Sequence, residues 1–187
     1  PEFEPFIFVT GMHLQKEYGY TLLEVERCGF TNIHTFENHT HETTMDLTLA
    51  KTIKGLSAYV KQCEPDMIVI HGDRVEALAG AIVGSLNNIL VSHIEGGEVS
   101  GTIDELIRHS TSKMSHVHFV SNKQAKKRLI QMGELENAIF TIGSPDVDIM
   151  FSTTLPNLET AKQYYEIAFD TYAVAMFHPV TTEVKFM

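Results

Sequence analysis

Residues 65–86 read PDMIVIHGDRVEALAGAIVGSL and decide the fold of the chain. Pro65 breaks the preceding pattern, and the apolar run Met67–Ile70 that follows has the length of a strand. This run is apolar on both faces, as in a strand at the middle of a parallel sheet that helices cover on both sides. The stretch Val75–Leu86 has the pattern of a helix, so the segment predicts a strand, a turn and a helix.

The same alternation continues along the chain in both directions. We predict further strands at residues 6–10, 32–35, 89–93, 117–120 and 139–142. We predict further helices at residues 21–28, 43–63, 103–114 and 123–131. Strand–helix–strand repetition with short loops predicts an α/β fold with a doubly wound, mostly parallel sheet of the Rossmann-like kind.

The rhythm changes after Gly143-Ser144-Pro145. Beyond this point we expect a helix at Leu155–Phe169 and one more strand at Tyr172–Phe177. We therefore assign residues 1–150 to a first domain. Residues 151–187 are then a connector and the first strand of a second, truncated domain.

Composition narrows the class of protein. The net charge of −10 disfavours a general nucleic-acid binder, and the one basic cluster, Lys123–Arg128, fits the solvated side of a helix. Cys28 and Cys63 form no C-x-x-C spacing, which excludes a disulfide framework and fits a reducing compartment. No run approaches the ~20 apolar residues that span a bilayer, and no signal peptide is visible. We expect a cytoplasmic protein, and the absence of an initial Met predicts that the chain starts inside a longer one.

Polar side chains stand where two predicted strands end and where a predicted helix begins. Ligands of open α/β sheets bind beyond the carboxyl ends of the strands, so we expect these segments to line a site. The segments are His71-Gly72-Asp73-Arg74, His93–Glu98 (HIEGGE) and Thr102–His109 (TIDELIRH).

Each polar residue of these segments also has an ordinary structural explanation. Asp73 can cap the following helix, and Glu95 can be a solvated loop residue. Asp104 and Arg108 are four apart, which is the spacing of a surface salt bridge on a helix. The convergence of several such residues on one sheet edge favours function over these separate explanations.

The converging set consists of three acids, an arginine and two histidines. Clustered carboxylates push one another's pKa values apart, so that one holds a proton while another takes one. This chemistry suits proton transfer at carbon or at a leaving group. The G-x-G-x-x-G, G-x-x-x-x-G-K-[ST] and G-x-S-x-G motifs are all missing from the sequence, which argues against nicotinamide, P-loop and serine-elbow chemistry.

Two histidine pairs raise the possibility of a metal. His39 and His41 fall in a predicted loop, and His116 and His118 lie beside a predicted strand. No third ligand stands at a recognisable zinc spacing, and surface or hydrogen-bonded histidines are commoner. We predict no metal site and no cofactor.

Two stretches carry a family resemblance: residues 65–74 (PDMIVIHGDR) and 93–109 (HIEGGEVSGTIDELIRH). Here the chain resembles the hydrolysing UDP-N-acetylglucosamine 2-epimerases, and most nearly those of the sialic-acid and related nonulosonic-acid pathways. Gly143-Ser144-Pro145 and residues 177–182 (FHPVTT) follow in the family's order. The resemblance covers essentially the whole chain.

The resemblance implies a fold and a reaction. The fold is that of two Rossmann-like domains facing each other across a cleft, as in GT-B glycosyltransferases, and this chain would be the first. In the reaction, UDP is eliminated as the C2 proton is removed, and water adds to the resulting 2-acetamidoglucal to give N-acetylmannosamine. The implied partners are a UDP-sugar substrate and further copies in a dimer or tetramer, with no nucleic acid and no membrane.

The resemblance also implies roles for individual residues. Asp73, Glu95 and Asp104 match the family's acid/base carboxylates, and His178 matches a histidine of the second domain that assists loss of UDP. Which carboxylate removes the C2 proton stays open, and Glu105 competes with Asp104. His71 and His93 line the pocket or orient Asp73 or Glu95. The expected substrate contacts are His71, His93, Glu105, Arg108, Gly96 and Gly97.

The sequence departs from the family's pattern in two places, and other functions compete with this assignment. The family's opening strand, with its arginine-bearing turn, does not precede Pro1, and most of the second domain does not follow Met187. The fragment itself is therefore expected to be inactive. Within the family, the substrate can instead be UDP-N,N′-diacetylbacillosamine. Outside it, the alternatives are a GT-B glycosyltransferase and a non-catalytic nucleotide-sugar-binding module.

Overall fold

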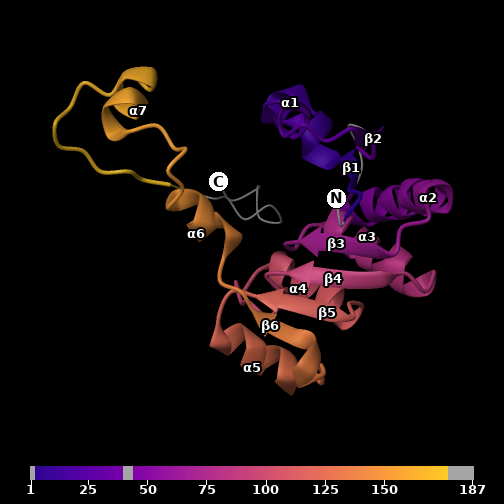
Figure 1. Cartoon of the computed structure of the whole chain (residues 1–187). Helices are drawn as coiled ribbons and strands as arrows, with labels where there is room; N and C mark the ends of the chain where they lie inside the picture. Colours follow the sequence, from indigo (N-terminus) through magenta and orange to yellow (C-terminus); the bar gives the residue numbers. More distant parts are fainter. Residues whose placement is uncertain (1–2, 40–43, 177–187) are drawn as a thin grey trace. The chain divides into compact units, whose positions relative to one another are not determined.

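The structure of the chain is a computed structural model that describes residues 3–39 and 44–176 (Figure 1). By its internal contacts the chain divides into two compact units, residues 1–142 and 143–187. The division falls before the boundary that we predicted at residue 150. The assignment of the later residues to a second Rossmann-like domain stays a prediction.

The first unit alternates strands with helices in the predicted order. Its strands are β1 (Phe6–Thr10), β2 (Asn32–Phe36), β3 (Met67–His71), β4 (Leu90–Ile94), β5 (Val117–Val120) and β6 (Ile139–Thr141). Its α-helices are α1 (Leu22–Arg27), α2 (Met45–Cys63), α3 (Val75–Leu86), α4 (Ile103–Lys113) and α5 (Lys123–Gln131). Short 3₁₀ turns are η1 (Gly11–Leu14), η2 (Lys16–Tyr18) and η3 (Glu136–Ala138). Every strand and helix predicted for this unit is present, with ends within two residues of those predicted.

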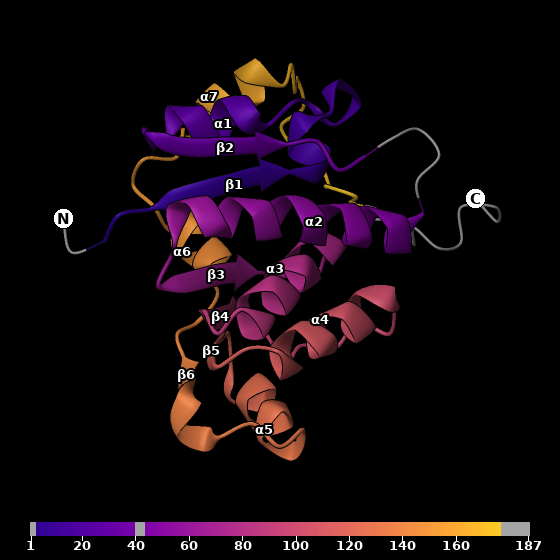
Figure 2. The same cartoon turned by 90° about the vertical axis from the view of Figure 1, so that its right-hand side faces the viewer.

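All strand pairs are parallel, as predicted, but the strands form two sheets where a single sheet was expected. β1 pairs with β2, and β3, β4, β5 and β6 pair in chain order (Figure 2). In the second sheet Ile70 lies opposite His93, and His71 lies opposite Ile94. The loops that follow β3 and β4 therefore start side by side at the carboxyl edge of this sheet.

The two sheets share one hydrophobic core across the interval between β1 and β3. Phe8 of β1 and Ile68 of β3 both pack against a cluster formed by Leu56, Val60 and Val83 on α2 and α3. A cavity of about 980 Å³ lies in this interval, lined by side chains of β1, β3 and α2. The helices thus hold the sheets in place although no described strand bridges them.

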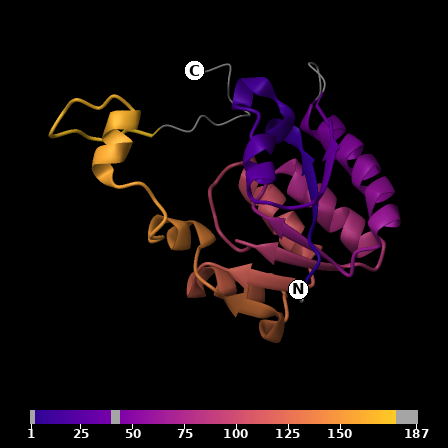
Figure 3. The ribbon, with the colours of Figure 1, turned by 45° about the horizontal axis from the view of Figure 1, so that its top comes forward.

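Helix α3 lies close to the sheet because the face that it buries carries small residues. Ala77 and Ala81 pack with Val91 of β4 in one core cluster. At Gly84, an added Cβ would clash with the Cγ2 atom of Val91. At Gly80, an added Cβ would lie 3.2 Å from Ile70 Cδ1, the mobile end of its side chain. Helix α2 packs alongside α3 (Figure 3).

The second unit departs from the sequence-based expectations. Helix α7 (Leu158–Tyr164) is shorter than predicted at both ends, and it starts only after Pro156, where the side chain of Asn157 caps it. Helix α6 (Pro145–Met150) was not predicted, although Pro145 at its first turn is a known helix-start signal.

The strand predicted at Tyr172–Phe177 is wrong for its described residues, 172–176, which form no strand. A strand needs a pairing partner, and no sheet is described in this unit. Phe177 lies outside the described residues. Across the described part of the chain, no helix has the length and apolarity needed to cross a membrane.

The contact between α3 and β4 yields a matched pair of substitutions. We expect Gly84→Ala to lower the free energy of unfolding by about 1–3 kcal/mol, because the new methyl group clashes with the stiff side chain of buried Val91. Gly80→Ala gains helix propensity, worth up to about 1 kcal/mol, and meets only the yielding end of Ile70. Urea unfolding of both variants tests this, and equal effects at the two positions would contradict it.

Candidate active site

Two loops and one helix start carry the polar residues predicted for the site. The loop after β3 holds Asp73, the loop after β4 holds Glu95, and Asp104 lies in the first turn of α4. The strand ladder continues past the ends of the strands, since the Gly72 backbone N–H donates to the Ile94 carbonyl oxygen at 3.3 Å. The backbone therefore fixes the loop after β3 to the end of β4.

Asp73 forms an ion pair with the guanidinium of Arg108 on α4. Arg108 is buried, and it also donates to the Glu98 carbonyl oxygen at 3.1 Å. Two ordinary explanations from the sequence are wrong. The cap position of α3 is Arg74, with no side-chain capping bond, so Asp73 is not a helix cap. Among the described ion pairs, Arg108 meets Asp73 and not Asp104.

Glu95 occupies a backbone conformation that a glutamate rarely adopts. Its φ is +67°, in the left-handed region, which costs a non-glycine residue on the order of 1 kcal/mol or more. Its Oε2 lies 2.9 Å from Nε2 of His71, and the two side chains are 27% and 46% exposed. The fold thus holds a carboxylate and an imidazole together at the protein surface, in spite of the backbone cost.

Asp104 and Glu105 are adjacent in sequence but differ in what they bind. Asp104 accepts a hydrogen bond from the Thr102 hydroxyl at 3.1 Å. Glu105 Oε2 accepts bonds from the backbone N–H groups of Gly101 and Ser100, each at 2.7 Å. These bonds lower the pKa of Glu105, so its carboxylate stays ionised while it fastens the loop before α4. Glu105 is thus engaged by two backbone groups, whereas the bond of Asp104 comes from a hydroxyl.

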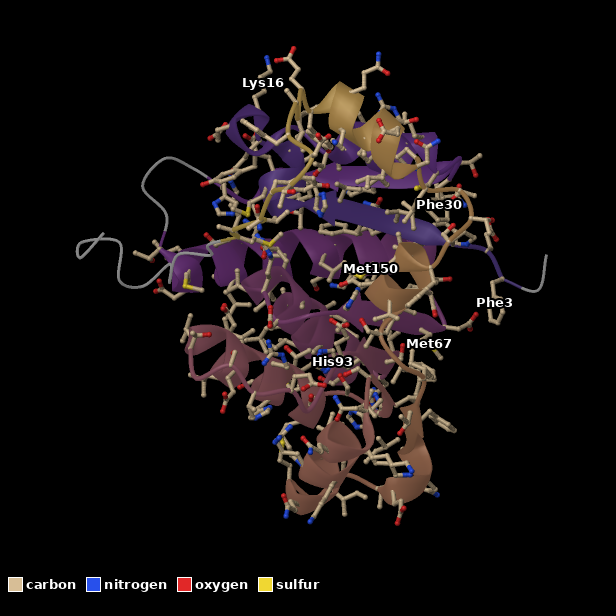
Figure 4. The ribbon with its side chains drawn as sticks, turned by 90° about the vertical axis from the view of Figure 1, so that its left-hand side faces the viewer. Phe3, Lys16, Phe30, Met67, His93 and Met150 are labelled. Atoms are coloured by element: carbon tan, nitrogen blue, oxygen red, sulfur yellow. The ribbon has the colours of Figure 1, made fainter. Side chains whose placement is uncertain are left out.

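His93 lies inside the protein, at the centre of the sheet (Figure 4). Its side chain is 0% exposed, so the ring lies behind the surface that a ligand would touch. Its Nε2 bonds to the Gly72 carbonyl oxygen at 2.9 Å, and its Nδ1 lies 3.0 Å from the Ser112 hydroxyl. Burial lowers the pKa of His93 to about 4.

Gly96 and Gly97 are buried and allow the loop after β4 to lie against its neighbours. An added Cβ at Gly96 would lie 2.8 Å from Ser112 Oγ. An added Cβ at Gly97, where φ is +80°, would lie 2.6 Å from the Ala125 carbonyl oxygen. Arg128 donates to the Gly97 carbonyl oxygen and fixes the same turn. Both glycines thus have a packing role in addition to the substrate contact that we predicted.

Two further residues that support the site were not identified from the sequence. Glu98 accepts hydrogen bonds from the Ser121 hydroxyl and, at 2.7 Å, from the Asn122 amide, which joins the loop after β4 to the end of β5. Ser112 contacts His93. The place of Glu98 at a strand end was a usable signal, whereas nothing in the sequence distinguishes Ser112 from other helical serines.

His118 on β5 and His116, directly before that strand, both have structural partners. His116 Nδ1 accepts from the Val91 backbone N–H at 3.1 Å. His118 Nε2 lies 3.3 Å from Glu134 Oε2, and Lys113 pairs with the same carboxylate at 2.6 Å. These contacts agree with the reading of the pair as hydrogen-bonded histidines.

The first unit therefore provides three carboxylates with three different partners. Asp73 faces an arginine, Glu95 faces a histidine, and Asp104 accepts from a hydroxyl. Carboxylates in different surroundings take different roles in proton transfer. His178, predicted to assist the leaving group, lies outside the described residues.

A family model described as UDP-N-acetylglucosamine 2-epimerase matches residues 1–186. The chain belongs to this epimerase family. The resemblance drawn from residues 65–74 and 93–109 is thereby confirmed.

Two relatives show how much of an epimerase the chain represents. The UDP-N-acetylglucosamine 2-epimerase of Neisseria meningitidis serogroup B is 52% identical over 187 residues, which are 100% of this chain and 50% of the relative. The hydrolyzing UDP-N,N′-diacetylbacillosamine 2-epimerase of Legionella pneumophila is 38% identical over 184 residues, which are 95% of this chain and 48% of the relative. The chain spans about half the length of these curated relatives.

A solved epimerase shares the fold. The crystal structure of UDP-GlcNAc 2-epimerase from Neisseria meningitidis bound to UDP-GlcNAc matches with a TM-score of 0.66 and 19% identity. The match covers 88% of this chain and 52% of that chain. It confirms the predicted fold class, a Rossmann-like α/β half of a GT-B-like architecture.

The burial of His93 predicts a pH dependence of stability. Its pKa is about 4 in the folded protein and 6.5 ordinarily; burial lowers it most, the bond to the Gly72 carbonyl raises it, and the neighbouring His118, Arg108 and His71 lower it further. Because the unfolded chain binds the proton first, the stabilisation is complete above pH 6.5 and is lost as the pH falls to 4. We expect wild type to lose about 3 kcal/mol relative to His93→Gln over this range. Urea unfolding at several pH values measures it, and parallel profiles would contradict it.

The backbone of Glu95 predicts a difference between two truncations of its side chain. Glu95→Gly and Glu95→Ala both remove the carboxylate, but only glycine adopts a φ of +67° without strain. We expect the glycine variant to be more stable than the alanine variant by about 1 kcal/mol, measured by thermal unfolding. Greater stability of the alanine variant would show that the left-handed conformation is not retained.

Proposed function

We propose that the protein containing this chain is a hydrolysing UDP-N-acetylglucosamine 2-epimerase. It converts UDP-N-acetylglucosamine and water into N-acetylmannosamine and UDP. The observation that carries the proposal is the set formed by Asp73, Glu95 and Asp104, delivered by two adjacent strand ends and one helix start in a member of this family.

The chemistry requires more than one proton-transfer group. In the first stage a base takes the C2 proton, the C–H electron pair becomes the C1–C2 double bond, and the C1–O bond breaks to release UDP. In the second stage the oxygen of water bonds to C1 while a base takes one of its protons, and the electron pair of the C1–C2 double bond takes up a proton at C2 on the opposite face. Removal and return at opposite faces call for groups on both sides of the sugar. Three carboxylates from separate elements supply candidates for these groups.

The partners of these carboxylates suit such work. Arg108 holds Asp73 in place by an ion pair whose arginine is buried. His71 holds Glu95 at 2.9 Å and offers a group that carries a proton away from it or back to it. The carboxylates are thus preorganised before a substrate arrives, which lowers the reorganisation needed during reaction.

The substrate is proposed from the relatives. The relative named for UDP-N-acetylglucosamine is 52% identical to this chain, and the one named for the diacetylbacillosamine nucleotide is 38% identical. Both names include epimerisation at C2 of a UDP-sugar, and the name of the Legionella relative adds hydrolysis, which supports a hydrolysing reaction. The higher identity favours N-acetylglucosamine as the sugar.

Proton NMR of the full-length protein with UDP-N-acetylglucosamine in D₂O tests the reaction. We expect free UDP together with N-acetylmannosamine that carries deuterium at C2. No UDP release, with turnover of the diacetylbacillosamine nucleotide, would replace the substrate. Sugar transfer to an acceptor would indicate a transferase, and binding without turnover would indicate a binding module.

A matched pair of substitutions at the two ends of β3 tests the carboxylate set. Asp73→Asn removes the acid at the carboxyl end, and we expect kcat to fall by about 10²- to 10⁴-fold. Asp66→Asn makes the same change in an exposed residue at the amino end, and we expect wild-type kcat. Glu95→Gln and Asp104→Asn should resemble Asp73→Asn. Comparable rates for all four variants would refute the assignment of these acids.

A further inference from the structure

His93 stands apart from the other predicted site residues because it has no access to solvent. It lies on the central strand β4, paired with Ile70 of β3 on one side and with His118 of β5 on the other. His71, in contrast, is 46% exposed and touches Glu95 directly. His93 therefore acts on the reaction, if at all, through other residues.

The ring of His93 contacts all three segments that carry the acids. Nε2 bonds to the Gly72 carbonyl oxygen at 2.9 Å, directly before Asp73 in the chain. Nδ1 lies 3.0 Å from the hydroxyl of Ser112, one turn beyond Arg108 on α4. The backbone of Gly96, directly after Glu95, lies so close that an added Cβ would come within 3.0 Å of Nδ1.

The hydrogen bonds select one form of the ring. A carbonyl oxygen only accepts, so Nε2 carries the hydrogen that it donates to Gly72. Burial keeps the ring neutral at ordinary pH by lowering the pKa of His93 to about 4. Nδ1 is then an acceptor, and it shares the single hydrogen of the Ser112 hydroxyl with the Arg108 carbonyl oxygen, to which that hydroxyl donates at 3.0 Å. A single neutral tautomer thus connects the turn after β3 to helix α4.

We propose that His93 is a positioning residue that sets the Gly72 turn and helix α4 relative to each other, so that Asp73 meets Arg108 at the sheet edge where the loop of Glu95 begins. The contacts at Gly72, Ser112 and Gly96 carry this inference, which rests on the proposed function of the site. His93 itself neither touches the substrate nor exchanges a proton with it.

Three variants of the full-length protein test the role. His93→Leu fills much of the space of the ring but bonds to neither partner. His93→Gln keeps an amide N–H that reaches for Gly72. Ser112→Ala removes only the bond at Nδ1. For His93→Leu we expect kcat to fall about 10- to 100-fold with KM changed less than about threefold, because displaced acids lose rate before they lose binding. His93→Gln should recover most of the rate, and Ser112→Ala should lie between wild type and His93→Leu.

The pH dependence of kcat separates positioning from acid/base catalysis. If His93 only positions other groups, the rising and falling limbs of the plot of kcat against pH stay at the wild-type pH values in every variant. The groups that titrate are still present in each of them. Loss of one limb in both His93→Leu and His93→Gln would overturn the proposal and make His93 an acid or base. Wild-type kcat in His93→Leu would overturn it as well.

Amide hydrogen exchange gives a readout that does not depend on turnover. We expect faster exchange in residues 71–76 of His93→Leu, with His93→Gln nearer to wild type. His118→Gln removes a buried histidine from the adjacent strand and should leave exchange in residues 71–76 unchanged. If wild type turns over no UDP-sugar, the proposed function fails while this comparison still decides whether His93 holds the turn. If His93→Leu does not fold, His93→Gln and Ser112→Ala supply the comparison.

Discussion

The hydrogen bonds that pair β3 with β4 in parallel determine where the acids of the site lie. His71 lies opposite Ile94, so the two strands end at the same level and deliver Asp73 and Glu95 to the same edge. A shift of the pairing by one residue would turn every side chain of β4 to the other face of the sheet. His93 would then leave the interior, and its bonds to Gly72 and Ser112 would be lost. The remaining contacts of the site refine a geometry that this register establishes.

The strands and helices of the first unit could be predicted from the sequence because each depends mainly on residues that are neighbours in the chain. The apolar run 67–70 and the helical pattern 75–86 are each specified by a few neighbouring residues, and both formed as predicted. The sequence did not reveal contacts between residues that are far apart in the chain. A helix cap was one explanation open to Asp73, and its partner Arg108 is 35 residues away in the chain. Likewise, residues 172–176 have the composition of a strand but no described neighbour with which to pair.

The candidate site also combines features that the sequence reveals with contacts that only the structure reveals. Its acids stand at strand ends, a position that is visible in a sequence, whereas the residues that hold them are visible only in three dimensions. Glu98 reaches Ser121 and Asn122 across two strands, and Ser112 reaches His93 from a helix. Glu95 itself, with its left-handed backbone, is held by its backbone N–H, which donates to the Phe119 carbonyl oxygen at 2.8 Å, and by the imidazole of His71.

The interval between β1 and β3 has a consequence for handling the protein. Neither facing edge pairs with a described strand, so each presents a row of backbone donors and acceptors. Apolar side chains flank these edges, among them Phe6, Met67 and Val69, which are 39%, 42% and 62% exposed. Open strand edges with apolar neighbours recruit strands from other molecules. In concentrated solution, we therefore expect residues 1–187, prepared as a separate protein, to aggregate edge to edge before they unfold.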